Sequence, residues 1–412
     1  MNRQRIFLFL LVTFSAPILS SGGAIGALRP EKDAEGQSAE EEATARGLGA
    51  SAASVYGREH GLSVAGYGEM LYEDFAAKDE AGASVDEPSK LDFLRAILYV
   101  GYRFDERFLF NSGIGFDQAS AEGAGATTLE FAYVEYMVNE HLSVRGGRLL
   151  VPMGLVNEFH EPDAFIGAKR SETEQRIIPT TWGENGLGFL GSFGSLHYRA
   201  YLLEGLDARG FGPSGIRGGR QKGGQGMASD WAGVVRVDIT PIPGVLAGIS
   251  LYRGGADHGA ITDAEGKGVG VTTTIYEAHA QIQLSGFELR GLFATARVSN
   301  VARLDAALEL EPGETVGEEM FGSLLQLTYD VFSLVPSTGM RLSPFVRYEF
   351  VDTHQRVPHG FAPDPAQEVR LLTFGIAFLP IEDVVLEGEY QLVTKGDASG
   401  VDQFNLALGY SF

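Results

Sequence analysis

Residues 404–412 read FNLALGYSF and alternate without a break between large apolar side chains and small or polar ones. The two faces are Phe404, Leu406, Leu408, Tyr410 and Phe412, and Asn405, Ala407, Gly409 and Ser411. A period of two residues is typical of a β-strand. A strand buried on both faces would be apolar on both, whereas lipid on one side and water on the other require this alternation. The stretch therefore favours a transmembrane barrel strand. The alternative, the last edge strand of a soluble sheet, would be prone to aggregation.

The aromatic end of this strand resembles the recognition signal of bacterial outer-membrane β-barrels. The resemblance lies in the apolar residues at every second position, which end in Tyr410 and Phe412. It implies that these two residues are an assembly signal, and that the outer-membrane assembly machinery is a partner of the chain.

The composition excludes several classes of protein. The 412 residues include no Cys, which excludes a disulfide framework and a thiolate metal site. The formal charge of −22 argues against nucleic acid as a partner, because phosphate binding needs a basic face. The eight His are scattered, and none lies in a metal-ligand pattern such as HExxH. We therefore expect no metal, no cofactor and no catalytic site.

The N-terminal region differs in composition from the rest. Residues 1–27 have Arg3 and Arg5 before a short apolar run and then small residues, as a secretory signal peptide does. Residues 28–60 are rich in Ala, Gly, Ser and Glu and are expected to form a flexible periplasmic leader. No later stretch approaches the roughly 20 apolar residues of a transmembrane helix. Residues 61–412 are expected to form the barrel.

The barrel region alternates amphipathic strands with turns, which predicts an all-β fold, a transmembrane antiparallel β-barrel of about 16 strands. The predicted strands are 62–73, 91–104, 107–117, 127–138, 141–150, 186–193, 195–204, 231–240, 245–253, 273–284, 287–298, 321–332, 341–352, 368–379, 384–394 and 402–412.

The connections between these strands alternate between short and long. Those after 91–104 and 127–138 have only a few residues, whereas those at 151–185 and 205–230 are long. Outer-membrane barrels have short periplasmic turns and long external loops, so both termini are predicted to be periplasmic. The glycine-rich run at 210–226 is expected to be a flexible external loop.

One face of most strands is charged and is expected to line a water-filled lumen, because charges facing lipid are costly. The predicted pore-wall residues are Arg95, Arg145, Arg199, Arg236, Arg290, Arg347, Glu277, Glu387 and Glu389. Strands 127–138 and 141–150 are apolar on both faces. Either a subunit interface or an infolded loop would explain that pattern.

The third long connection combines apolar and charged residues. Phe159, Phe165 and Ile166 are too apolar for a disordered loop and predict packing against the inner wall. Its charged residues would then face the lumen and narrow the pore, opposite Arg95, Arg145 and Arg199. This predicted constriction comprises His160, Glu161, Asp163, Lys169, Arg170, Glu172, Glu174 and Arg176.

The segment GRLLVPMGL at residues 147–155 resembles the entry into the third loop of the phosphate-selective porin O/P family and its general-porin relatives. Residues 169–170, 179–182 and 186–188 are similar to the return from that loop. The resemblance implies a 16-stranded barrel, a third loop folded into the lumen and a homotrimer.

Together these features predict a porin of the bacterial outer membrane, surrounded by lipid, through which small hydrophilic solutes or ions diffuse. The alternative is a non-channel barrel: a surface scaffold, an adhesin or a barrel enzyme with a filled lumen.

Overall fold

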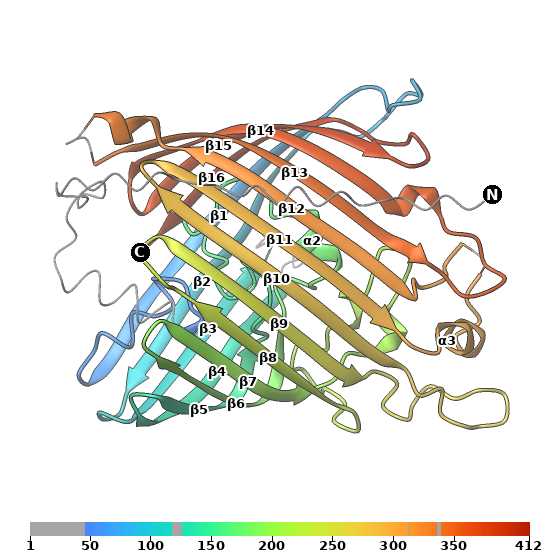
Figure 1. Ribbon diagram of the computed structural model, residues 1–412, viewed down its shortest axis with the longest axis horizontal. Helices are drawn as coiled ribbons and strands as arrows, with labels where there is room; N and C mark the ends of the chain where they lie inside the picture. The colour runs from blue at the N-terminus through green and yellow to red at the C-terminus, as the bar shows by residue number, and fades with distance from the viewer. Residues whose placement is uncertain (1–45, 118–125, 312, 336–338) are drawn as a thin grey trace, which may run out of the picture.

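The computed structural model describes residues 46–117, 126–311, 313–335 and 339–412. Within them, sixteen antiparallel strands form one closed barrel (Figure 1). The predicted signal peptide and residues 28–45 of the predicted leader lie outside the described residues, as does most of the predicted connection at 118–126.

The sixteen strands follow the predicted order, and each pairs with its neighbours in the sequence. Their bounds are β1 (Gly61–Phe75), β2 (Lys90–Arg103), β3 (Phe108–Asp117), β4 (Ala126–Asn139), β5 (Leu142–Leu150), β6 (Gly183–Phe193), β7 (Leu196–Glu204), β8 (Trp231–Ile239), β9 (Val245–Gly255), β10 (Thr272–Leu284), β11 (Phe287–Val298), β12 (Glu319–Tyr329), β13 (Arg341–Arg356), β14 (Glu368–Ile381), β15 (Val384–Lys395) and β16 (Gln403–Ser411).

The barrel closes between β1 and β16, where the last residues of the chain pair with the first strand. The backbone of Phe412 exchanges two hydrogen bonds of 2.9 Å with Gly66. A Cβ atom at Gly66 would lie 2.9 Å from the Phe412 ring, and one at Gly68 would lie 2.5 Å from the Tyr410 ring. Glycine at these two positions of β1 therefore leaves room for the aromatic rings of β16 where the two strands pair.

The outer face of the barrel is apolar and the inner face is polar, as predicted. On β12, Leu325 is 56 % exposed, whereas the next residue, Gln326, is 3 % exposed. The short turns and the long loops lie at opposite ends of the barrel. Figure 1 shows the loop that contains α3 (Val301–Ala307) beyond the end opposite the C-terminus.

The helices are short. Besides α3 they are α2 (Glu172–Arg176) and the 3₁₀ turns η1 (Ala208–Gly210), η2 (Arg217–Gly219), η3 (Val331–Leu334) and η4 (Pro365–Gln367). None of the helices in the described residues is long and apolar enough to span a membrane. The largest group of buried apolar residues joins the inner wall to residues 48–56, 151–182 and 206–216, and to loop residues at 256–271 and 301–316. Several connecting segments therefore pack against the barrel wall.

Candidate channel constriction

The third loop, residues 151–182, folds into the barrel, as predicted. Arg236 on β8 donates a hydrogen bond of 2.5 Å to the carbonyl oxygen of Gly154. The backbone N–H of Gly167 donates one of 2.7 Å to the carboxylate of Glu387 on β15. These two strands lie far apart in the strand order. The loop therefore crosses the lumen and contacts the wall on both sides.

The apolar residues of the loop pack against the wall. Ile166 is 6 % exposed and lies in a cluster with Phe345, Ala377, Leu379 and Val385 of β13, β14 and β15. Phe165 is equally buried, and Phe159 is half-buried. The predicted contact between loop and wall is confirmed for Ile166, and Phe165 is buried in the large apolar group inside the barrel.

Two of the loop carboxylates predicted to face the lumen point into the protein instead. Glu161 is 2 % exposed and accepts hydrogen bonds from the backbone N–H groups of Ser51, at 3.1 Å, and Ala52, at 2.9 Å. Burial, with a smaller contribution from the charge of Asp163, raises the pKa of Glu161 to about 7. Glu174 is 1 % exposed and accepts hydrogen bonds from two backbone N–H groups of its own loop, at residues 155 and 156. The prediction is wrong for both residues, because backbone donors inside the protein hold them.

Two further predicted residues also have partners in the wall. Asp163 accepts a hydrogen bond of 2.9 Å from the hydroxyl of Ser411 on β16. His160 is buried, and its Nε2 atom lies 2.9 Å from the carboxylate of Glu130 on β4. Both side chains tie the loop to the barrel, so neither is free to meet a solute as predicted.

The remaining charged residues of the loop stay partly exposed inside the barrel. Lys169 forms an ion pair of 2.8 Å with Glu73 on β1, and its side chain is 25 % exposed. Glu172 and Arg176 pair within α2 at 2.6 Å and are 26 % and 25 % exposed. Arg170 donates a hydrogen bond to the Thr181 hydroxyl at 2.6 Å. These four residues keep contact with water at the level of the loop.

Arg199 on β7 is predicted to face the loop across a water-filled gap but contacts it directly. Its guanidinium forms an ion pair of 2.8 Å with Glu158 of the loop and a second ion pair with Asp238 on β8. All three side chains are at most 3 % exposed. There is no gap at this point of the wall, because the loop carboxylate fills it.

Most of the other predicted pore-wall residues pair within the wall and are covered. Arg145 binds Glu135 of β4 at 2.5 Å and is 3 % exposed. The wall pairs are Arg95 with Glu69, Arg236 with Asp238, Glu277 with His279, Arg290 with Glu288, and Arg347 with Glu349. Glu387 and Glu389 accept hydrogen bonds from the loop backbone at Gly167 and Ala168. All nine residues face inward, yet only Arg95 and Arg290 keep side-chain exposure above 10 %.

Residues 46–57 also lie inside the barrel, which corrects the prediction of a flexible leader for this stretch. Arg46 forms an ion pair with Glu135, and the Tyr56 hydroxyl donates a hydrogen bond of 2.6 Å to the same carboxylate. Asn111 donates a hydrogen bond of 2.8 Å to the carbonyl oxygen of Ala52. A Cβ atom at Gly49 would lie 2.3 Å from the carboxylate carbon of Glu161. This N-terminal segment is therefore fitted closely between the wall and the third loop.

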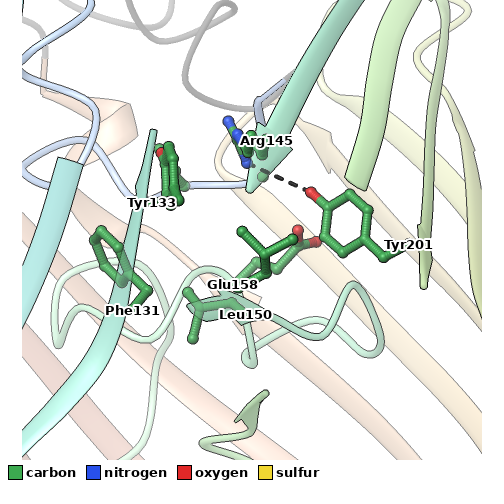
Figure 2. A pocket seen from close by; sticks show the side chains of 9 residues that line it. Phe131, Tyr133, Arg145, Leu150, Glu158 and Tyr201 are labelled. Atoms are coloured by element: carbon green, nitrogen blue, oxygen red, sulfur yellow. Dashed lines mark hydrogen bonds between the residues drawn. The ribbon is translucent and has the colours of Figure 1, made fainter. Parts of the chain in front are cut away.

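Figure 2 shows where the wall, the third loop and the N-terminal segment meet. The residues around this cavity include Leu48, Phe131, Tyr133, Arg145, Leu150, Glu158 and Tyr201. Arg145 points toward Tyr201 and donates a hydrogen bond of 3.4 Å to its hydroxyl. The cavity is about 10 Å³, the space of a single water molecule. The inward apolar residues of β4 and β5 therefore pack beneath inserted chain.

No model of a known protein family matches the chain. An uncharacterized protein of Aquifex aeolicus (strain VF5) is 33 % identical over 377 residues, which cover 89 % of this chain and 83 % of that protein. The chain belongs to the same family as this protein.

Solved structures with the same fold include outer-membrane porins. The anion-selective porin from Comamonas acidovorans has a TM-score of 0.55 at 13 % identity, over 86 % of this chain and all of that one. Salmonella typhi OmpF in complex with daunomycin has a TM-score of 0.55 at 12 % identity, over 86 % and 98 %. The trimer form of Vibrio cholerae OmpT, an outer membrane protein, has a TM-score of 0.53 at 9 % identity, over 86 % and 100 %. This family member therefore has the fold of a porin barrel, as predicted. The narrower resemblance, to the phosphate-selective porins, is not confirmed.

A second loop of this family member, residues 205–230, also folds inward, where the sequence predicted a flexible external loop. Thr353 of β13 donates a hydrogen bond of 2.6 Å to the carbonyl oxygen of Pro213. Ile216 is fully buried and Phe211 is 6 % exposed. Arg220 donates hydrogen bonds to the carbonyl oxygens of Pro179, at 3.2 Å, and Thr181, at 2.5 Å. The glycines allow this loop to fold compactly, and the buried side chains of Phe211 and Ile216 hold it inside the barrel.

Proposed function

We propose that the protein is a channel of the bacterial outer membrane through which small hydrophilic solutes or ions diffuse passively. Two findings support this proposal. The barrel is closed, with an apolar outer face and a charged interior, and solved outer-membrane porins have the same fold. Diffusion through a wet pore needs no catalytic group, so the proposed role is not that of an enzyme.

The observation that carries the proposal is the exposure of charged groups inside the barrel. The side chains of Lys169, Glu172 and Arg176 belong to the inserted loop and remain about one quarter exposed. Because ionised groups need water or partners, this exposure is what a water-filled passage beside the loop requires. We propose that these residues and Arg170 border the narrowest part of the passage. The buried residues His160, Glu161 and Glu174 and the half-buried Asp163 hold the loop in place.

We also propose that residues 1–27 direct export, and that the barrel is surrounded by outer-membrane lipid and inserted by the assembly machinery that reads Tyr410 and Phe412. A homotrimer is proposed as the assembled form, and the trimer form of Vibrio cholerae OmpT supports it. The mass of the protein in mild detergent, measured by light scattering, tests this state.

The second candidate is a non-channel barrel with a filled lumen. The burial of wall residues such as Arg199, Arg236 and Glu389, each 1 % exposed, favours it, as does the N-terminal segment inside the barrel. Single-channel recording in a planar bilayer separates the two candidates. Stepwise currents with the purified protein support the channel, and silence at all voltages and salts supports the filled barrel.

A further inference from the structure

Three arginines from the two inward-folded loops, Arg170, Arg217 and Arg220, lie close to one another. Arg170 of the third loop and Arg220 of the 205–230 loop both bind Thr181, the first through its hydroxyl at 2.6 Å and the second through its carbonyl oxygen at 2.5 Å. Arg220 also donates a hydrogen bond of 3.0 Å to the carbonyl oxygen of Arg217. Thr181 and the backbone thus hold two guanidinium groups in place beside Arg217.

Arg217 has no acceptor for its guanidinium among the residues that the structure describes. Its Nη1 atom is buried without a hydrogen-bond partner, and so is the Nε atom of Arg170. Burial and the positive charges of Arg220, Arg170 and Arg95 lower the pKa of Arg217 to about 9. Positively charged guanidinium groups repel one another, and partial burial strengthens this repulsion because less water screens it.

Two wall carboxylates lie within electrostatic reach of the cluster, Glu184 near Arg220 and Glu130 near Arg170, and each already accepts hydrogen bonds from other residues. No ion pair among the described residues neutralises Arg217, so the cluster keeps an excess of positive charge.

The carboxylates of the third loop do not neutralise this positive charge. Glu158, Glu161 and Glu174 are bound to Arg199 or to backbone N–H groups deep in the protein. Glu172, an acidic neighbour that opposes the lowering of the Arg217 pKa, is paired with Arg176 at 2.6 Å. The third loop is acidic in sequence, but these four carboxylates are already bound to other partners.

The cluster is also fixed in position. Ile216, next to Arg217, is fully buried, and a Cβ atom at Gly215 would lie 2.6 Å from the carbonyl oxygen of Arg176. The backbone N–H of Gln221 donates a hydrogen bond of 3.0 Å to Glu184 on β6. A site held this way loses little conformational entropy when a ligand binds.

We propose that Arg170, Arg217 and Arg220 form a binding site for a small oxyanion, a carboxylate or a phosphate, in the passage of the channel. Guanidinium groups present paired N–H donors that match the oxygen atoms of both anions. This inference rests on the proposed channel function, because the ligand must reach the site through the lumen. The site would retain the anions that it binds and so distinguish them from other anions of similar size, which a passage without the arginines would not do.

Isothermal titration calorimetry of the full-length protein in detergent tests the site without needing conductance. The probes are inorganic phosphate and succinate, titrated in separate experiments. We expect saturable binding of at least one of them, weakened about tenfold by Arg217→Gln, as for the loss of one charge-assisted hydrogen bond. The control is Arg209→Gln, in the same loop, where the arginine is half exposed and pairs with Asp207; it should bind like the parent. Heat-modifiable migration confirms that each variant is folded.

Each outcome has one meaning. Binding of phosphate alone, succinate alone or both supports the site and identifies its preferred oxyanion. No saturable binding of either probe, or equal affinity in Arg217→Gln and the parent, overturns it. Binding by a protein that carries no current would instead reject the channel and keep the site, so the two proposals fail separately.

Discussion

Leu386 and Glu387 are neighbours on β15 and meet opposite surroundings. Leu386 points outward and is 44 % exposed, whereas Glu387 points inward, is 6 % exposed and binds the backbone of Gly167. The outer face has one uniform proposed partner, lipid, so any large apolar residue serves there. Side chains on the inner face bind specific groups of residues that are distant in the sequence. The stability contributed by each inner residue therefore depends on its own partner. The two faces should therefore respond differently to substitution.

The largest expected loss of stability is on the inner face. Arg199→Met would leave Glu158 and Asp238 buried without their common partner, and breaking a buried ion pair from one side costs about 3–5 kcal/mol. The free energy of unfolding in lipid vesicles, from urea titration, measures the loss. Arg209→Met in the exposed part of a loop is the control and should cost less than about 1 kcal/mol. Equal losses would mean that the inner charges are solvated, as in a wide pore.

A somewhat smaller loss is expected on the outer face. Leu325 lies near the middle of β12 and is 56 % exposed. Leu325→Arg should destabilise the barrel by about 2–4 kcal/mol, the cost of a charge near the bilayer midplane. Leu325→Phe is the matched control and should be nearly neutral in the same urea titration. If arginine were tolerated there as well as phenylalanine, the outer face would be in water rather than in lipid.

The contact between the third loop and the N-terminal segment should depend on pH. The pKa of Glu161 is raised to about 7 by burial, above its value in the unfolded chain. The folded state therefore binds the proton more tightly, so its stability is fullest below about pH 4 and falls as pH rises to about 7. Glu161→Gln should remove about 3 kcal/mol of this pH dependence. Parallel stability–pH curves for the variant and the parent would contradict the buried position of this carboxylate.

The smallest change in folded-state stability is expected at the end of β16. The Phe412 side chain is 63 % exposed, and its backbone bonds to Gly66 do not need the ring. Phe412→Ser should therefore cost about 1 kcal/mol or less in the refolded barrel, yet lower the yield of barrel in the outer membrane. Ala407→Ser on the inner face is the control for yield. An unchanged membrane yield would show that the terminal aromatic residue is not an assembly signal.

The difference between the faces also explains how much of the fold could be predicted. Strand order, strand number and the outward set on most strands follow from a local period of two residues, because an apolar and an aqueous side impose the same pattern wherever nothing else covers the wall. Some predicted strand ends differ from the structure by three or four residues, and at a short turn β12 ends at Tyr329 rather than 332. β13 continues to Arg356 rather than 352, and β6 begins at Gly183 rather than 186, because ladder pairing there extends beyond the stretches with clear alternation.

The interior could not be predicted in the same way. The carboxylate of Glu161 binds Ala52, which is 109 residues away in the sequence, and no local pattern links the two. Small residues such as Gly47 and Gly49 make residues 46–57 look like a flexible leader, but they are small because charged side chains lie against them. The apolar inner faces of β4 and β5 were the available signal. They indicated that some segment covers these inner faces, but not which segment of the sequence it is.

The most direct test compares the single-channel conductance of the parent with that of a variant that lacks residues 46–57. We infer that a wet passage lies beside the third loop and that the N-terminal segment, residues 46–57, narrows it. The parent should give stepwise currents in a planar bilayer, and the variant should give larger steps and admit larger neutral polymers. Folding of both is checked by heat-modifiable migration. A folded parent that never conducts, or a folded variant with the same conductance and the same polymer cutoff, would contradict this inference.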